Sequence, residues 1–188
     1  MPLRIALFAS GSGSNAENIF QYFSHNPKFQ FPLIISNKPD AFIHERAKKL
    51  NIPSFTFSRE DFSNGVPIMD ALLKQEIDVI VLAGFLLKIP LVLIDGFPGK
   101  IINIHPALLP KYGGKGMYGH HVHEAVKTSG DTESGITIHY VNAHYDEGNI
   151  IFQAKCPVLP NDTPDMIAEK VHALEYEYLP KVIEQLWV

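Results

Sequence analysis

An asparagine and a histidine separated by one residue end an apolar run, in the segment Asn103-Ile104-His105-Pro106. Because alternate side chains of a strand share a face, Asn103 and His105 would lie on one side, about 6.6 Å apart. A carboxamide can bind the oxygen of a reacting carbonyl, and an imidazole can donate or shuttle a proton. Asp146 could orient His105 and favour its charged form. The alternative is a structural histidine, with Asp146 an ordinary turn residue.

A glycine-rich segment, Ser10-Gly11-Ser12-Gly13-Ser14-Asn15-Ala16, joins the first predicted strand to the first predicted helix. Glycines let the backbone approach an anion, and the start of a helix offers free N–H groups. Serine and asparagine side chains add hydrogen-bond donors. The segment therefore predicts a phosphate site. The alternative is a structural turn in which Ser14 or Asn15 only caps the helix.

The same spacing fits the pattern Gly-x-Gly-x-x-Ala, so a dinucleotide-binding enzyme is a second alternative. That alternative needs an acidic residue at the end of the second strand, about 20 residues further on. The strand ends Ser36-Asn37-Lys38 instead, and Asp40 lies beyond it. Lys38 suits a 2′-phosphate, so an NADP-dependent oxidoreductase stays open, although a phosphate monoester fits better.

Histidines in the second half of the chain raise the question of a metal site. They are His120, His121, His123, His139 and His144. The sequence has no His-Glu-x-x-His pattern, and its single cysteine, Cys156, has no partner for a metal-binding pair. We therefore predict no metal. His139 lies in a predicted strand, where a packing or supporting role is expected.

Short apolar runs alternate with helical patterns in the first half of the chain, which predicts a parallel sheet covered on both faces. The predicted strands are 3–9, 33–36, 54–57, 77–83 and 101–104, and the predicted helices are 15–24, 41–50 and 67–75. The expected fold class is α/β, with a Rossmann-like, open, mostly parallel twisted sheet.

The second half begins with a predicted irregular loop over Lys111–Gly119, followed by a helix over residues 121–129. Strands over residues 136–142 and 149–158 are expected to form an antiparallel hairpin. A last helix begins near Pro164, and we expect Pro180 to kink or split it.

Composition limits the classes of protein. The chain has 188 residues, 46% of them hydrophobic, and a formal net charge of −4, which argues against a dedicated nucleic-acid binder. Its first apolar run is too short for a signal peptide or a membrane span. We expect a cytoplasmic protein with one domain, 1–188, small-molecule partners, and neither a nucleic acid nor a membrane as partner. The oligomeric state is not legible.

Several motifs in order resemble the phosphoribosylglycinamide formyltransferase family, from about Arg4 to about Leu186. They are the segments 10–15, 81–85, 102–106 with 108–112, 135–139 and 146–148. The resemblance implies transfer of a formyl group from 10-formyltetrahydrofolate, as co-substrate, to the amine of 5′-phosphoribosylglycinamide in purine synthesis. It implies no metal.

The resemblance also assigns residues by matching position. It implies substrate phosphate binding by Gly13, Ser14 and Asn15, ribose binding by Glu175, and catalysis by Asn103, His105 and Asp146. Folate contacts fall on Leu86, Leu87, Lys88 and Ile89, together with Asn103. On this basis residues 1–100 form a phosphate-binding half, and residues 101–188 form a catalytic and folate-binding half.

The chain departs from the family pattern at Leu86-Leu87, where the family usually has Met-Arg, so that Lys88 is the available cation. Related formyl-group enzymes share the catalytic trio. A formyltetrahydrofolate hydrolase normally carries an extra regulatory domain, and a methionyl-tRNA formyltransferase a basic carboxyl-terminal domain. The length and the glycine loop favour a small phosphorylated acceptor, with the hydrolase as an alternative.

Overall fold

The computed structural model describes residues 1–187, which divide into two compact units. The first unit is Met1–Asn103 with Trp187, and the second is Ile104–Leu186. Strand β5 (Ile101–His105) begins in the first unit and ends in the second.

The sheet of the first unit has the strand order β3-β2-β1-β4-β5, with all neighbours parallel. Its other strands are β1 (Leu3–Phe8), β2 (Phe29–Ser36), β3 (Ser54–Thr56) and β4 (Val79–Leu82). On the central strand, Ala6 pairs with Ile80 and Leu7 pairs with Ile34. Because the order reverses at β1, the carboxyl end of this strand is where such sheets bind ligands.

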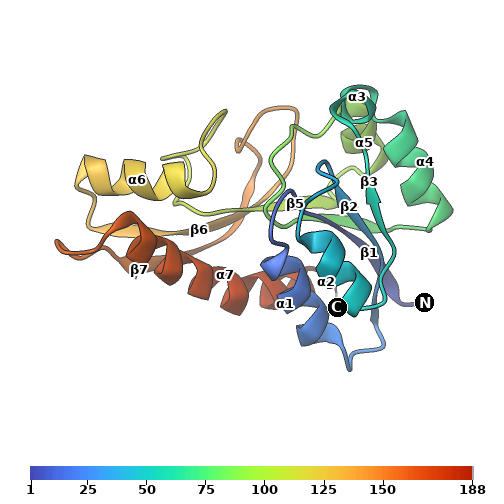
Figure 1. The fold of residues 1–188 in the computed structure, drawn as a ribbon, viewed down its shortest axis with the longest axis horizontal. Helices are drawn as coiled ribbons and strands as arrows, with labels where there is room; N and C mark the ends of the chain where they lie inside the picture. Colours follow the sequence, from blue (N-terminus) through green and yellow to red (C-terminus); the bar gives the residue numbers. More distant parts are fainter. Residues whose placement is uncertain (188) are drawn as a thin grey trace. The chain divides into compact units, whose positions relative to one another are not determined.

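Helices connect these strands (Figure 1). They are α1 (Ser14–Phe23), α2 (Ile43–Lys49), α3 (Arg59–Asn64), α4 (Val66–Lys74) and α5 (Leu91–Gly96). Helix α1 contacts α2, whereas α4 contacts α3 and α5. Right-handed crossovers to opposite sides of β1 place these two groups of helices on opposite faces of the sheet.

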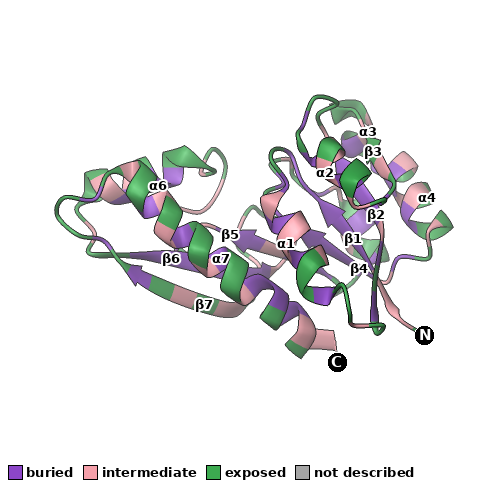
Figure 2. Cartoon of the chain, turned by 60° about the horizontal axis from the view of Figure 1, so that its bottom comes forward, coloured by how far each residue is buried: buried purple, intermediate pink, exposed green. Residues whose placement is uncertain are grey.

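The core of the first unit lies on the strands. Residues 5–8 of β1 are fully buried, and every residue of β4 is buried. Figure 2 shows buried residues concentrated in the strands, with exposed residues on the outer sides of the helices. Burial on both faces explains why these strands are near-continuous apolar runs.

In the second unit, β6 (Glu133–Tyr140) follows the end of β5 in the sheet, and β7 (Ile150–Pro157) pairs antiparallel with β6. Two helices complete the unit, α6 (His120–Ser129) and α7 (Pro164–Trp187). Phe152 of β7 lies against Tyr178 of α7, with ring centroids 4.9 Å apart. The predicted fold class, a mostly parallel α/β sheet with an antiparallel hairpin, is confirmed.

Some elements differ from prediction. Strand β2 begins at Phe29 because Phe29 and Phe31 are both buried, which extends the strand beyond the apolar run used to predict it. The short helices α3 and α5 were not predicted. We predicted that Pro180 would kink or split the last helix, and the helix is not split, because α7 continues through Pro180. Pro180 is buried beside Leu179, so packing outweighs the lost hydrogen bond.

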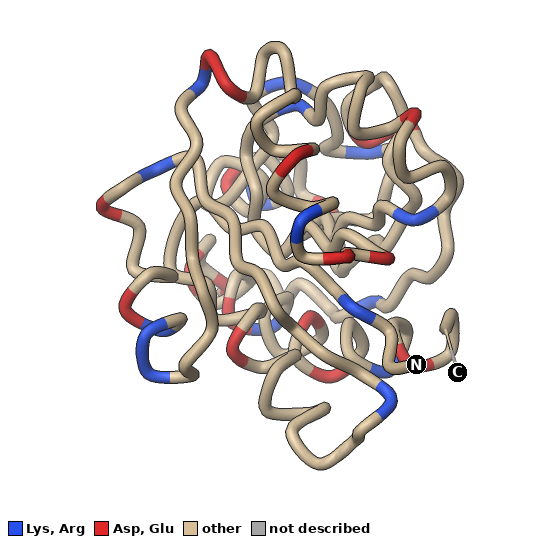
Figure 3. The backbone as a smooth tube through the Cα atoms, turned by 90° about the vertical axis from the view of Figure 1, so that its right-hand side faces the viewer, with Lys and Arg blue, Asp and Glu red and all other residues tan. Residues whose placement is uncertain are grey.

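Charges of both signs are interspersed along the chain (Figure 3). Within the described residues, the helices are too short or too polar to cross a membrane.

Candidate active site

The structure brings His105 and Asp146 together. His105 is the last residue of β5, and its Nδ1 atom lies 3.6 Å from Oδ2 of Asp146. Both side chains are largely buried, with exposed fractions of 4% and 12%. This separation is an ion-pair distance rather than a hydrogen bond. Asn103 lies two residues before His105 on the same strand and is half-buried.

Local backbone geometry places the carboxylate of Asp146. Asp146 has a φ of 56°, a left-handed conformation that aspartate tolerates better than most residues. The backbone N–H of Gly114 donates a hydrogen bond to its Oδ2 atom, at 2.9 Å. A side chain at Gly113 would meet the Cβ atom of Asp146 at 3.3 Å and Leu109 at 2.6 Å. The glycine-rich loop therefore closes directly on the carboxylate.

The second ring nitrogen of His105 is also engaged. Its Nε2 atom lies 2.7 Å from the carbonyl oxygen of Tyr112, and because a carbonyl only accepts, Nε2 carries the proton. Burial lowers the pKa of His105, while the charge of Asp146 and the Tyr112 carbonyl oppose that effect. The expectation that Asp146 favours charged His105 has the right sign, but burial outweighs it.

Asp146 has a second imidazole neighbour, for which the sequence indicated a packing or supporting role. Nε2 of His139, on β6, lies 3.6 Å from Oδ1 of Asp146. Burial raises the pKa of Asp146, but His139, His105 and the Gly114 N–H together hold this pKa below its ordinary value. Asp146 is therefore ionised at neutral pH.

The glycine loop of the first unit leaves β1 and opens α1. Gly13 has a φ of 70° and occupies the cap position, so it is not Ser14 or Asn15 that caps the helix. A Cβ atom at Gly13 would lie 2.1 Å from Cδ1 of Ile43. Only glycine fits this position. Because glycine has no side chain, Gly13 cannot cap the N–H groups in the first turn of α1.

Hydrogen bonds to other segments of the first unit fix the same loop. The hydroxyl of Ser10 donates to Oδ1 of Asn37 at 2.5 Å and accepts from the N–H of Leu86 at 2.9 Å. Arg46 of α2 donates from Nε to the carbonyl of Ser12 at 2.8 Å and forms an ion pair with Glu17. These contacts join the predicted phosphate loop to the predicted folate segment that starts at Leu86.

In that folate segment, Leu86 and Lys88 are exposed, Leu87 is half-buried and Ile89 is buried. Glu175 lies in the second unit, on α7, and is buried; its Oε2 accepts a hydrogen bond from Nδ1 of His172 at 2.7 Å. This bond is the main reason why the pKa of His172 is raised.

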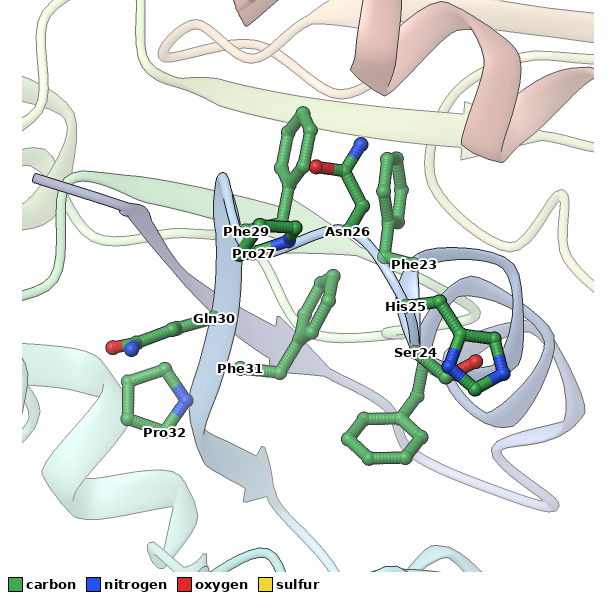
Figure 4. A pocket seen from close by; sticks show the side chains of 10 residues that line it. Phe23, Ser24, His25, Asn26, Pro27, Phe29, Gln30, Phe31 and Pro32 are labelled. Atoms are coloured by element: carbon green, nitrogen blue, oxygen red, sulfur yellow. The ribbon is translucent and has the colours of Figure 1, made fainter.

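A pocket of about 530 Å³ lies at the turn between α1 and β2 (Figure 4). Its lining includes the four phenylalanines Phe20, Phe23, Phe29 and Phe31. Because it adjoins the amino end of β2, it lies away from the strand ends that carry the predicted phosphate loop. Among the described residues, no group of three or more His, Cys, Asp and Glu side chains is arranged to hold a metal ion.

Residues 3–183 match the model of the formyl transferase family. A chloroplastic phosphoribosylglycinamide formyltransferase of Arabidopsis thaliana is 40% identical over 96% of this chain, which spans 64% of that relative's length. The Bacillus subtilis phosphoribosylglycinamide formyltransferase is 37% identical, over 97% of this chain and 94% of its own. The chain belongs to the phosphoribosylglycinamide formyltransferase family.

Similarity in three dimensions agrees with this membership. The crystal structure of glycinamide ribonucleotide transformylase 1 from Geobacillus kaustophilus matches with a TM-score of 0.91 and 33% identity, covering all of both chains. The resemblance inferred from the motifs is thereby confirmed. None of these relatives supports the NADP-dependent oxidoreductase or the formyltetrahydrofolate hydrolase alternative.

Proposed function

We propose that this chain transfers the formyl group of 10-formyltetrahydrofolate to the amine of 5′-phosphoribosylglycinamide, releasing tetrahydrofolate in purine biosynthesis. Family membership over nearly the whole chain supports the reaction. The observation that carries the residue assignment is the pairing of His105 with Asp146, residues far apart in sequence whose atoms lie 3.6 Å apart.

Acceptor binding is assigned to two groups of residues. The phosphate is held by Gly13, Ser14 and Asn15, since a helix N-terminus attracts an anion and Gly13 puts no side chain in its way. The ribose hydroxyls bind Glu175, whose buried carboxylate is an acceptor held in place by His172. A hydroxyl hydrogen bond to a charged group of this kind contributes more than one between neutral groups.

Formyl transfer then needs donors that bind the formyl oxygen and a route that carries the proton of the attacking amine to the leaving group. The neutral amine attacks the formyl carbon, giving a tetrahedral intermediate with an oxyanion and an ammonium. Asn103 donates its amide N–H to the oxyanion, and His105 donates from its ring. Asp146 accepts the ammonium proton through water and passes it to the departing N10 of the folate, so the proton count balances.

The charge state of His105 follows from its surroundings. Burial keeps the resting imidazole largely neutral at neutral pH, with the Tyr112 carbonyl accepting its N–H. The substrate oxygen replaces that carbonyl as the acceptor. Negative charge then develops beside the ring and raises the pKa of His105, so the imidazole takes a proton from solvent water as the oxyanion forms and returns it when the intermediate collapses.

The folate segment fits a ring system with an acidic tail. Leu86 and Leu87 offer apolar surface at the end of β4, and exposed Lys88 offers a cation for a carboxylate. The amide of Asn103 completes the set of folate contacts on the neighbouring strand, since β4 and β5 are paired through Leu82 and Asn103. No step of this assignment requires a metal.

The deciding experiment follows tetrahydrofolate release spectroscopically from 10-formyltetrahydrofolate, with and without phosphoribosylglycinamide. We expect release that depends on the acceptor and yields formylated acceptor in equal amount. Release without acceptor would instead establish the hydrolase. Saturable NADPH binding, measured by its fluorescence and competed by phosphoribosylglycinamide, would favour the oxidoreductase.

A further inference from the structure

Asp146 lies between two buried imidazoles rather than beside one. Its Oδ2 atom is 3.6 Å from Nδ1 of His105, and its Oδ1 atom is 3.6 Å from Nε2 of His139. The rings come from different strands, β5 and β6, and their exposed fractions are 4% and 3%. One carboxylate therefore faces two groups that can each carry a positive charge.

The far nitrogen of each ring faces a backbone carbonyl. Nε2 of His105 lies 2.7 Å from the oxygen of Tyr112, and Nδ1 of His139 lies 2.9 Å from the oxygen of Tyr140. Because carbonyl oxygens only accept, both of these nitrogens carry hydrogen. In either neutral ring, the nitrogen that faces Asp146 then has no hydrogen, and its lone pair points toward the carboxylate. One added proton on either ring turns that repulsion into attraction.

Strand β6 is built to aim His139 in this direction. The pairing of β6 with β7 shifts register between Ile138 and His139, and a bulge of this kind redirects the side chain that follows it. A side chain at Gly148 would meet the carbonyl oxygen of Tyr140 at 1.6 Å. The absence of a Cβ atom there lets the chain close on the carbonyl that holds His139.

We propose that His139 is a positioning residue of the formyl-transfer site, sharing with His105 the single negative charge of Asp146. The inference rests on the proposed function and extends it from a trio to a group of four. His139 acts through Asp146 and contacts no reacting atom in this assignment. Its effect is to set the pH range in which Asp146 is ionised and His105 is able to donate.

Other charged and titratable groups face this cluster, and they define the background against which His139 acts. Glu175 on α7 raises the pKa of His105, opposite to the effect of His139. His123 on α6 is electrostatically coupled to both His105 and Glu175. The Gly114 N–H donates a hydrogen bond to Asp146, and this hydrogen bond does not involve His139. Among these, His139 is the group that lies at ion-pair distance from the second oxygen of Asp146.

The test is the pH dependence of kcat in His139→Gln and His139→Asn. Glutamine places an uncharged amide toward Asp146, and asparagine keeps a donor for the Tyr140 carbonyl, but neither can carry charge. His139 lowers the pKa of His105 and helps to lower the pKa of Asp146. Both variants should therefore shift the whole bell-shaped profile to higher pH, with kcat on the alkaline limb rising relative to the unmodified protein and both KM values little changed.

The matched control is His25→Gln, an exposed histidine of the first unit, which should leave the profile where it is. Thermal unfolding of each variant separates a loss of folded protein from a loss of rate. A fall in kcat with an unmoved profile would assign His139 a packing role and overturn the inference. Absence of acceptor-dependent transfer by the unmodified protein would refute the proposed function instead.

A second test uses the unmodified protein and requires neither a variant nor enzymatic activity. Ring nitrogen signals of ¹⁵N-histidine, followed by NMR from acid to alkaline pH, report the protonation of each imidazole. We expect the His139 signals to shift as His105 changes its protonation, with the hydrogen of each neutral ring on the nitrogen that faces a carbonyl. A His139 ring unchanged throughout the titration of His105 would overturn the proposal.

Discussion

At the scale of single residues, a small number of groups fixes the position of Asp146 in the site. A left-handed backbone at Asp146, one N–H donated by Gly114 and two imidazoles surround its carboxylate. Residue 113 must be a glycine for Asp146 to lie here, because a Cβ atom on Gly113 would crowd the Cβ atom of Asp146. Position and charge of this carboxylate can therefore be tested separately.

Replacing Asp146 by asparagine keeps the shape and the Gly114 hydrogen bond but removes the charge. We expect kcat for formyl transfer to fall by about 10²-fold or more, the usual contribution of one acid–base group. The Kd values of both ligands, measured by calorimetry, should change little. Near-normal turnover in Asp146→Asn would remove this residue from the mechanism.

A residue-scale prediction also concerns Gly13. Its φ of 70° and the 2.1 Å approach of Ile43 exclude any Cβ atom. Gly13→Ala should lower the unfolding free energy by about 1–3 kcal/mol, the usual cost of backbone strain, and raise the KM for phosphoribosylglycinamide. Urea denaturation and initial rates measure the two effects.

Gly11 offers the comparison for this change, since a Cβ atom there would meet no neighbour within 4 Å. Gly11→Ala should leave the unfolding free energy close to that of the unmodified protein. Equal stability losses in both variants would show that the loop needs flexibility rather than the particular conformation of Gly13.

At the scale of elements, Thr137 of β6 ties the segment after His105 to the antiparallel hairpin. Its buried hydroxyl donates to the carbonyl of Ala107 at 2.6 Å and accepts from the N–H of Leu109 at 3.0 Å. Nε2 of Gln153, on β7, donates to the same hydroxyl at 2.9 Å. One side chain therefore connects three segments that surround the site.

Thr137→Val keeps the shape of the side chain and leaves these polar groups without their shared partner. We expect a loss of about 1–3 kcal/mol in unfolding free energy for each buried group left unsatisfied. Thr137→Ser keeps the hydroxyl and should be clearly more stable than the valine variant when both are unfolded in urea. A valine variant as stable as the serine variant would show that the network contributes nothing.

Elements were predictable from sequence where burial alone determines them. The strands β1 and β4 are apolar throughout because both faces are covered, and their runs are visible without any structure. Helices α3 and α5 have six residues each, too few for a helical repeat to appear in the sequence. Helix α7 is not split at Pro180, because tertiary packing of α7 overrides a local preference.

The site shows the same division. Residue types indicated that Asp146 could orient His105, and the family resemblance placed both in the catalytic trio; His105 ends β5, and Asp146 lies in the turn between β6 and β7. The position of His139 depends on a register shift beside Ile138, and the sequence carries no alternation or turn signal for it. The Tyr112 carbonyl is likewise a backbone contact that side-chain motifs do not reveal.

At the scale of the whole molecule, buried histidines connect the site to the pH dependence of folding. His123, on α6, is 3% exposed, and its Nδ1 atom has no hydrogen-bond partner among the described residues. Burial, and then the neighbouring His172, lower its pKa from 6.5 to about 4. The folded protein thus keeps His123 neutral at pH values where the unfolded chain binds a proton.

This difference makes folding less favourable in acid. Between pH 6.5 and about pH 4 the unfolded state holds more protons at His123, so the unfolding free energy falls as the pH drops through this window. At about 1.4 kcal/mol for each pKa unit, His123 accounts for up to about 3 kcal/mol of that fall. His123→Leu, which cannot titrate, should flatten the dependence of unfolding free energy on pH, measured by urea denaturation at pH 7 and pH 4.5. If the leucine variant loses as much stability in acid as the unmodified protein, the acid sensitivity arises elsewhere, and His105, whose pKa is lowered by burial in the same way, becomes the next residue to replace.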